Sequence, residues 1–245
     1  MMKDILTVLW KEGIEFLHMR GSARSTFLTM IFPLLILGIL FPLQFGRHWV
    51  ASPASLIVWI WIPFILTSSM IADSIAGEKE RHTLETLLAS RLPDRAILFG
   101  KLLASMLYAL GLTFLMILIG LVTVNIAFFQ DGLIWFDSRY FIAGAALGVL
   151  GTGLVSTSGI LVSLKARTVR QAQQTLSFGI VIIAVLPSLF FTVLPVHLRK
   201  RLFSALNTLD GELVLFSVLI ALLVIDGLLL TAATRRFTRN RLMTE

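Results

Sequence analysis

Long runs without a charged residue constrain this 245-residue chain more than any other feature of its sequence. Five such runs lie between charged residues, and each is longer than the roughly 20 residues that cross a bilayer as a helix. A sixth run, from Leu213 to Thr234, is interrupted only by Asp226. The runs are continuously apolar, whereas the strands of a membrane barrel are short and alternate in polarity. The sequence therefore predicts an all-α integral membrane protein with six transmembrane helices, at about 25–45, 54–75, 102–126, 140–164, 174–195 and 213–234.

The composition excludes an ordinary soluble domain, and the positions of the histidines argue against an enzyme. Only 14% of the residues are charged and 57% are hydrophobic, whereas a soluble domain is about 25% charged. The chain has no cysteine, which excludes disulfides and thiolate metal sites. Its histidines are scattered and form no cluster with acidic residues, as a metal site or an acid–base pair would require. We therefore expect no catalytic residue, no metal site and no cofactor site in this chain.

The basic residues predict the orientation, because Lys and Arg are retained on the cytoplasmic side of short loops. With the N-terminus inside, 16 of the 21 Lys and Arg residues lie in cytoplasmic segments. We therefore expect a multi-pass protein of the cell membrane with both termini in the cytoplasm. The net charge of +7 then reflects topology and attraction to anionic membrane lipid, and nucleic acid is not expected as a partner.

Two segments are predicted to form amphipathic helices beside the membrane. In residues 1–24, apolar residues such as Leu6 and Trp10 fall on one arc of a helix and charged residues fall on the other, as in helices that lie flat at the interface. This segment either anchors the chain alone or also contacts a cytoplasmic partner. In the membrane domain, residues 25–245, a second amphipathic element is expected at about 196–211, near the external surface of the membrane.

Charged residues are concentrated in residues 72–101, which the topology places in the cytoplasm between the second and third membrane helices. Three leucines at helical spacing follow the first charged residues, so a short helix with one charged and one apolar face is expected at about 77–91. Gly77 is expected to separate it from the preceding membrane helix. Pro93 and Asp94 are expected to end it and to begin the next helix.

This region, GEKERHTLETLLASRLPDRAILFGKLLA, resembles the coupling-helix region of ABC-2 type permeases, the membrane subunits of type V ABC exporters. In that family, acidic and basic residues lead into Thr-Leu-Glu, two leucines, a turn, a basic residue, an aliphatic pair and Gly-Lys. The matching residues here are Glu78, Glu80, Arg81, Thr83, Leu84, Glu85, Leu87, Leu88, Arg95, Ile97, Leu98, Gly100 and Lys101. His82 stands where glycine is usual, and Pro93 comes two positions later than the family's usual proline.

The resemblance implies an exporter in which two permease copies sit on two cytoplasmic ABC ATPase subunits. The ATPase would contact the residues from Glu78 to Leu88 that match the motif. ATP and Mg would be bound by the ATPase subunits, because Gly100-Lys101 lacks the preceding glycine and the following Ser or Thr of a phosphate-binding loop. A homodimer is favoured over a heterodimer, and the substrate is a lipid, drug, peptide or ion.

Asp226 is the one ionisable residue deep in a predicted membrane helix. Because a carboxylate there costs about 2.5 to 3.5 kcal/mol, it should face protein or water. Asp226 either contacts substrate or a proton, or it bonds to a neighbouring helix or an interfacial arginine. Two other functions are considered: an ion-coupled secondary transporter that uses Asp226, and a haem-exporter-like permease of cytochrome maturation.

Overall fold

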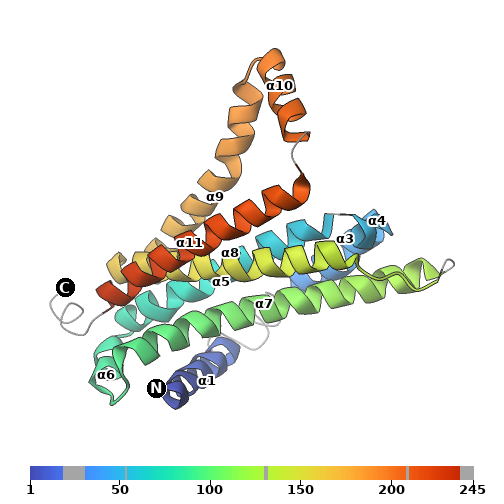
Figure 1. Ribbon diagram of the computed structural model, residues 1–245. Coiled ribbons are helices and arrows are strands. Elements are labelled where there is room, and N and C mark those ends of the chain that lie inside the picture. The colour runs from blue at the N-terminus through green and yellow to red at the C-terminus, as the bar shows by residue number, and fades with distance from the viewer. Residues whose placement is uncertain (19–30, 53, 130–131, 208–209, 238–245) are drawn as a thin grey trace.

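The computed structural model describes residues 1–18, 31–52, 54–129, 132–207 and 210–237, and every regular element in these ranges is helical (Figure 1). A helix over residues 31–45 includes the π-helical turn η1 (Ile36–Leu40) and α3 (Phe41–Phe45). The other helices are α1 (Met2–His18), α4 (His48–Ala51), α5 (Ala54–Glu80), α6 (Leu84–Ala89), α7 (Asp94–Ala127), α8 (Ser138–Lys165), α9 (Val169–Val193), α10 (Val196–Asn207) and α11 (Gly211–Arg236).

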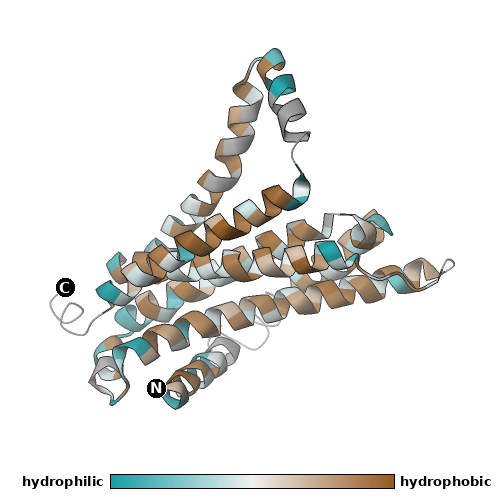
Figure 2. Ribbon diagram, in the orientation of Figure 1, coloured by the Kyte–Doolittle hydropathy of each residue, from teal (hydrophilic) through white to brown (hydrophobic). Residues whose placement is uncertain are grey.

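Four helices in the described ranges are long and apolar enough to cross a membrane, namely most of α5 and all of α7, α8 and α11. Figure 2 shows hydrophobic residues along most of their length. They overlap four of the six predicted spans. The fifth predicted span lies largely within α9, and the first corresponds to a short apolar helix, Ile31–Phe45, whose preceding residues 25–30 are not described. An all-α membrane protein is thus confirmed, and the number six stays a prediction.

The centre of the bundle is formed by α5 packed against α7 and α8. Glycines along one face of α8 receive large side chains of α5: a Cβ at Gly144 would lie 2.6 Å from Trp59 Cδ1, and Gly151 faces Phe64 in the same way. Small residues at a helix interface allow two backbones to approach closely. The glycines therefore allow α5 and α8 to pack closely.

A proline explains how the helix over residues 31–45 fits against α7. Pro42 has no N–H, so the carbonyl of Gly38 loses its usual helical partner. The hydroxyl of Thr123 on α7 donates to Gly38 O at 3.2 Å and satisfies it. The local widening into the π-helical turn η1 lies at the same place, as is common where a helix loses a backbone bond.

The C-terminal helices spread away from this core. Figure 1 shows α9 leaving the bundle, α10 at its far end, and α11 returning along α8. The predicted element at 196–211 is therefore helical over Val196–Asn207, and its side of the membrane stays a prediction. Large apolar side chains such as Phe178 and Phe190 are exposed on α9, where membrane lipid or another subunit would cover them.

The connection between α5 and α7 differs from the sequence prediction. Helix α5 continues through Gly77 to Glu80, so the prediction that Gly77 separates two helices was wrong. The missing Cβ of Gly77 leaves room for the side chain of Asp73. The break comes at His82, which has φ 57. This left-handed conformation costs most residues about 1–2 kcal/mol but suits glycine, which explains why glycine is usual at this position in the family that the motif resembles.

Candidate functional site

The first helix, the short helix and one end of the bundle meet at a single corner. Figure 1 shows α1 beside α7, close to the turn that carries α6. Gly100 on α7 allows this approach, because a Cβ there would lie only 2.5 Å from Val8 Cβ on α1. Val8 is buried in this contact. The N-terminal helix is therefore held against α7 by close packing.

A buried lysine joins α1, α5 and α7. Lys101 Nζ donates to Glu12 Oε1 at 2.7 Å, to Glu78 Oε1 at 3.0 Å and to Ser74 O at 2.6 Å. These three bonds use all three donors of the ammonium group. The Lys101 side chain is 1% exposed and the Glu12 side chain 3%. Charges so well buried are tolerated only when they are paired, so this contact requires all three helices in place.

Lys11 extends the contact toward the surface. Lys11 Nζ lies 3.0 Å from Glu78 Oε1 and 3.2 Å from Glu15 Oε1. Burial lowers the pKa of Lys11, but the hydrogen bond and charge of Glu78, with the charges of Glu12 and Glu15, raise it by more, so it lies above its ordinary value of 10.5. Lys11 is therefore charged at neutral pH. We call Lys11, Glu12, Glu15, Glu78 and Lys101 the ionic cluster.

Three other charged residues tie the α5–α6 corner to its neighbours. Glu80 Oε2 accepts a hydrogen bond from the backbone N–H of Val169 at 3.1 Å, at the start of α9. Arg81 Nη2 lies 3.2 Å from Asp73 Oδ1 on α5. Lys79 donates to the carbonyl of Leu164 at the end of α8. A displacement of this corner would therefore act on α5, α8 and α9 together.

Helix α6 has one buried face and one exposed face. Leu84 is buried, and Leu87 packs against the hydrophobic core formed by α5, α7, α8 and α9. Glu85 and Thr86 are exposed, as is Thr83 immediately before the helix. The side chain of Leu88 lies outside the described residues. Glu78 and Lys101 differ from the charged residues near α6, because both lie inside the chain within the ionic cluster.

The sequence did not predict the part of α1 that holds it in place. The predicted apolar face of α1 contains residues such as Leu6 and Trp10, which are exposed in the structure. The buried positions are Val8 and Glu12, four residues apart on a third face of the helix. A carboxylate one turn after an apolar residue was the available signal, but its partner, Lys101, lies 89 residues away.

Asp226 lies far along the chain from this corner, on α11 opposite α8. A Cβ at Gly153 would lie 2.8 Å from Asp226 Oδ2. Asp226 Oδ1 is buried, and no described residue forms a hydrogen bond with it. The described residues contain no group of three His, Cys, Asp or Glu residues able to hold a metal ion.

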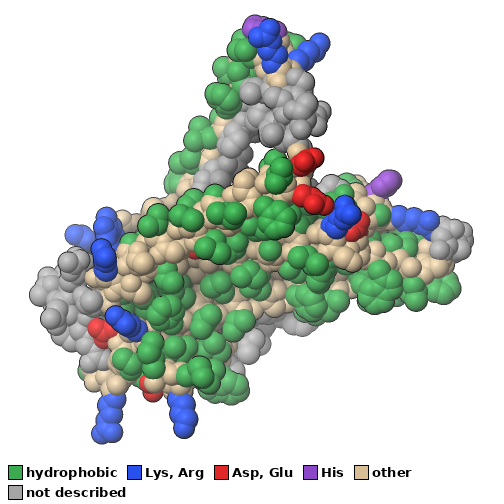
Figure 3. Space-filling model, in the orientation of Figure 1, with side chains coloured by type: hydrophobic (Ala, Val, Ile, Leu, Met, Phe, Trp, Pro, Cys, Tyr) green, Lys and Arg blue, Asp and Glu red, His purple; other side chains and the backbone are tan. Residues whose placement is uncertain are grey.

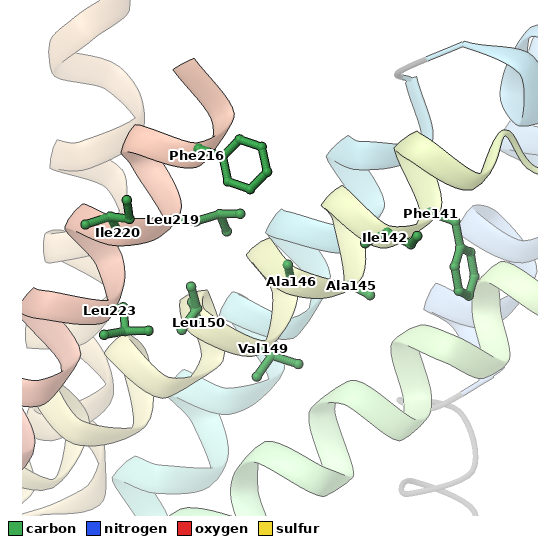
Figure 4. Close-up of a pocket in the computed structure, with 10 residues that line it drawn as sticks. All are labelled: Phe141, Ile142, Ala145, Ala146, Val149, Leu150, Phe216, Leu219, Ile220 and Leu223. Carbon is green, nitrogen blue, oxygen red and sulfur yellow. The ribbon is translucent and has the colours of Figure 1, made fainter. Parts of the chain in front are cut away.

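An open groove between α8 and α11 encloses about 540 Å³. Figure 4 shows its lining, with Phe216, Leu219, Ile220 and Leu223 from α11 facing α8 residues from Phe141 to Leu150. All ten lining side chains are apolar. The groove therefore offers no side-chain hydrogen bond to a ligand, and it suits hydrocarbon.

The comparisons with known proteins agree with the architecture. The family model described as ABC-2 family transporter protein matches residues 49–229, which is most of the chain. The chain belongs to the ABC-2 transporter family. The matched region includes α6, Glu78 and Lys101, whereas α1 with Glu12 precedes it.

A curated relative is the ABC transporter permease protein NatB of Bacillus subtilis (strain 168). It is 28% identical over 144 residues, which cover 53% of this chain and 36% of the relative. The match therefore spans about a third of the relative's length.

Proposed function

We propose that this chain is the permease subunit of an ATP-driven ABC exporter in the cell membrane. In this proposal the chain has six transmembrane helices with both termini in the cytoplasm. It assembles with a second permease copy and two ABC ATPase subunits. The substrate, a lipid, drug, peptide or ion, moves outward. The observation that carries it is the α5–α6–α7 corner, where a short helix with an exposed polar face is fixed between two membrane-spanning helices.

The exposed face of α6 is the proposed docking surface for the ATPase. Glu85 and Thr83 face outward there, together with Glu80 and Arg81 at the preceding turn. Leu84 and Leu87 face the core, so they hold α6 on the bundle. We leave Glu78 out of the docking surface because it is buried and already paired with Lys101.

The contacts of the corner support a mechanical role. A force on α6 reaches α5 and α7 directly through the chain, and it reaches α1 through the ionic cluster. Packed helices of this kind move as rigid bodies when a partner closes. Closure of the two ATPase subunits on ATP would thus alter the path between the two permease copies.

Charge reversal on α6 tests the docking surface. We expect Glu85→Lys to weaken association with the ABC ATPase that co-purifies with the chain by about tenfold, because a charge at a docking surface contributes to both rate and affinity. The measurement is co-purification together with stimulation of ATP hydrolysis.

Glu212→Lys is the matched control, because Glu212 is also exposed but begins α11 at the other end of the bundle. Equal association of the wild-type protein and both variants would contradict docking at α6. Absence of any ATPase partner would contradict the permease proposal itself.

The buried, unpartnered oxygen of Asp226 is the observation that favours the second candidate, ion-coupled transport. Under the exporter proposal, transport by Asp226→Asn in proteoliposomes should still require ATP and be unaffected by a proton or sodium gradient. Gradient-driven transport that the substitution abolishes would favour the second candidate. Glu212→Gln serves as the control for loss of an exposed carboxylate.

A further inference from the structure

A second groove lies beside the α5–α6 corner, on the side of the connection between α8 and α9. It encloses about 480 Å³. Its walls carry basic residues, and its floor is formed by buried apolar residues. The basic residues are Lys79, Lys165 and Arg167, and the apolar residues are Leu84, Leu164 and Ala166.

The groove carries an excess of positive charge. Three permanent cations face one carboxylate, that of Glu85. Lys79 is held in place by its bond to the Leu164 carbonyl. Among the described residues, neither Lys165 nor Arg167 forms an ion pair, and both are exposed. Figure 3 shows other basic side chains at the same end of the molecule.

The position of the groove at the ends of two apolar helices corresponds to the level of the lipid headgroups. Lys165 is the last residue of the spanning helix α8, and Lys79 lies in the last turn of α5. Basic side chains at such helix ends lie at the level of lipid phosphates. The apolar floor offers a surface for the glycerol and the first acyl carbons of a lipid. A free anion would make no use of such a surface. A basic wall over an apolar floor fits an anionic amphiphile better than an acidic protein segment.

We propose that this groove binds the phosphodiester headgroup of an anionic phospholipid. Arg167 is the side chain suited to hold two phosphate oxygens at once, with Lys165 as a second cation. Bound there, the lipid contacts His82 and Glu85 at the turn into α6. The stability of the corner then depends on the lipid composition. Glu85 also lies on the proposed docking surface, but the cations of this site, Lys79, Lys165 and Arg167, do not.

The test measures lipid retention and stability of the purified full chain. Retention of phosphatidylglycerol, of phosphatidylcholine and of inorganic phosphate is compared by native mass spectrometry, and melting temperature is followed with each added. We expect phosphatidylglycerol alone to be retained and to raise the melting temperature. In Lys165→Gln/Arg167→Gln, retention should be on the order of tenfold weaker. Both side chains are exposed, so this variant should fold.

Arg235→Gln/Arg236→Gln is the matched control, because it removes two exposed charges from the last turn of α11. It should retain phosphatidylglycerol as the wild-type protein does. An equal loss in both double variants would overturn the site in favour of general attraction to a basic surface. Stabilisation by inorganic phosphate alone would show a free-anion site instead. Unchanged lipid retention with loss of the ATPase would show that an acidic protein segment occupies the groove.

Discussion

Lys101→Met should lower the free energy of unfolding by about 3–5 kcal/mol, because it leaves two carboxylates buried without their main cation. Glu12 and Glu78 both bond to the Lys101 ammonium. Lys11, which is 42% exposed, is the only cation left to them among the described residues. The measurement is chemical unfolding of the detergent-purified protein, followed by tryptophan fluorescence.

Two further variants make the result specific. Lys165→Met removes an exposed lysine and should change the free energy of unfolding by less than about 0.5 kcal/mol. Lys101→Met/Glu12→Gln/Glu78→Gln removes all three main charges and should recover most of the loss, because neutral groups cost far less to bury. If Lys101→Met is no more harmful than Lys165→Met, then the ionic cluster does not hold the three helices together.

Gly100→Ala should lower the free energy of unfolding by about 1–3 kcal/mol, the usual cost of overpacking. The added methyl group would lie 2.5 Å from Val8 Cβ and 3.3 Å from the carbonyl of Ile5. Because Cβ of Val8 does not move when the side chain changes rotamer, only a shift of α1 away from α7 can relieve the contact. Limited proteolysis should then cleave within Met2–His18 faster than in the wild-type protein.

Gly111→Ala is the matched control on the same helix. A Cβ at Gly111 would meet no atom within 4 Å. Since alanine favours a helix over glycine by about 1 kcal/mol, this variant should be neutral or more stable than the wild-type protein. Equal effects of the two substitutions would show that α1 does not rest on Gly100. Because Gly100→Ala also strains the contact between Lys101 and Glu12, the two large effects predicted here should not be additive.

Much of the fold could be predicted from local pattern. Uncharged runs located α5, α7, α8 and α11, the four helices in the described ranges that are long and apolar enough to cross a membrane, because a bilayer requires continuous apolar length. Pro93 and Asp94 marked the start of α7, although the N-cap is Pro93 and not Asp94 as predicted. The extent of α5 was missed because glycine usually ends or weakens a helix, whereas Gly77 lies in mid-helix for a tertiary reason, the space needed by Asp73.

The candidate site likewise has a part that the sequence predicts and a part that it does not. Charge and leucine spacing identified α6 and its neighbours as an unusually charged segment, and they marked Glu85 as exposed and Leu87 as apolar-facing. They also grouped Glu78 with the docking residues. Its burial could not be predicted, because the side chains that surround it come from residues 11, 12 and 101.

The sequence by itself determined that this chain is helical, lies in a membrane and carries one short charged joint between two of its helices. These properties follow from apolar length and charge distribution, which are local. Only the tertiary structure decided which charges face outward and which are buried. It also decided that α1 packs against α7 at Gly100 and pairs with it at Lys101. A buried ion pair depends on the distance between residues far apart in the chain, and no local pattern records that distance.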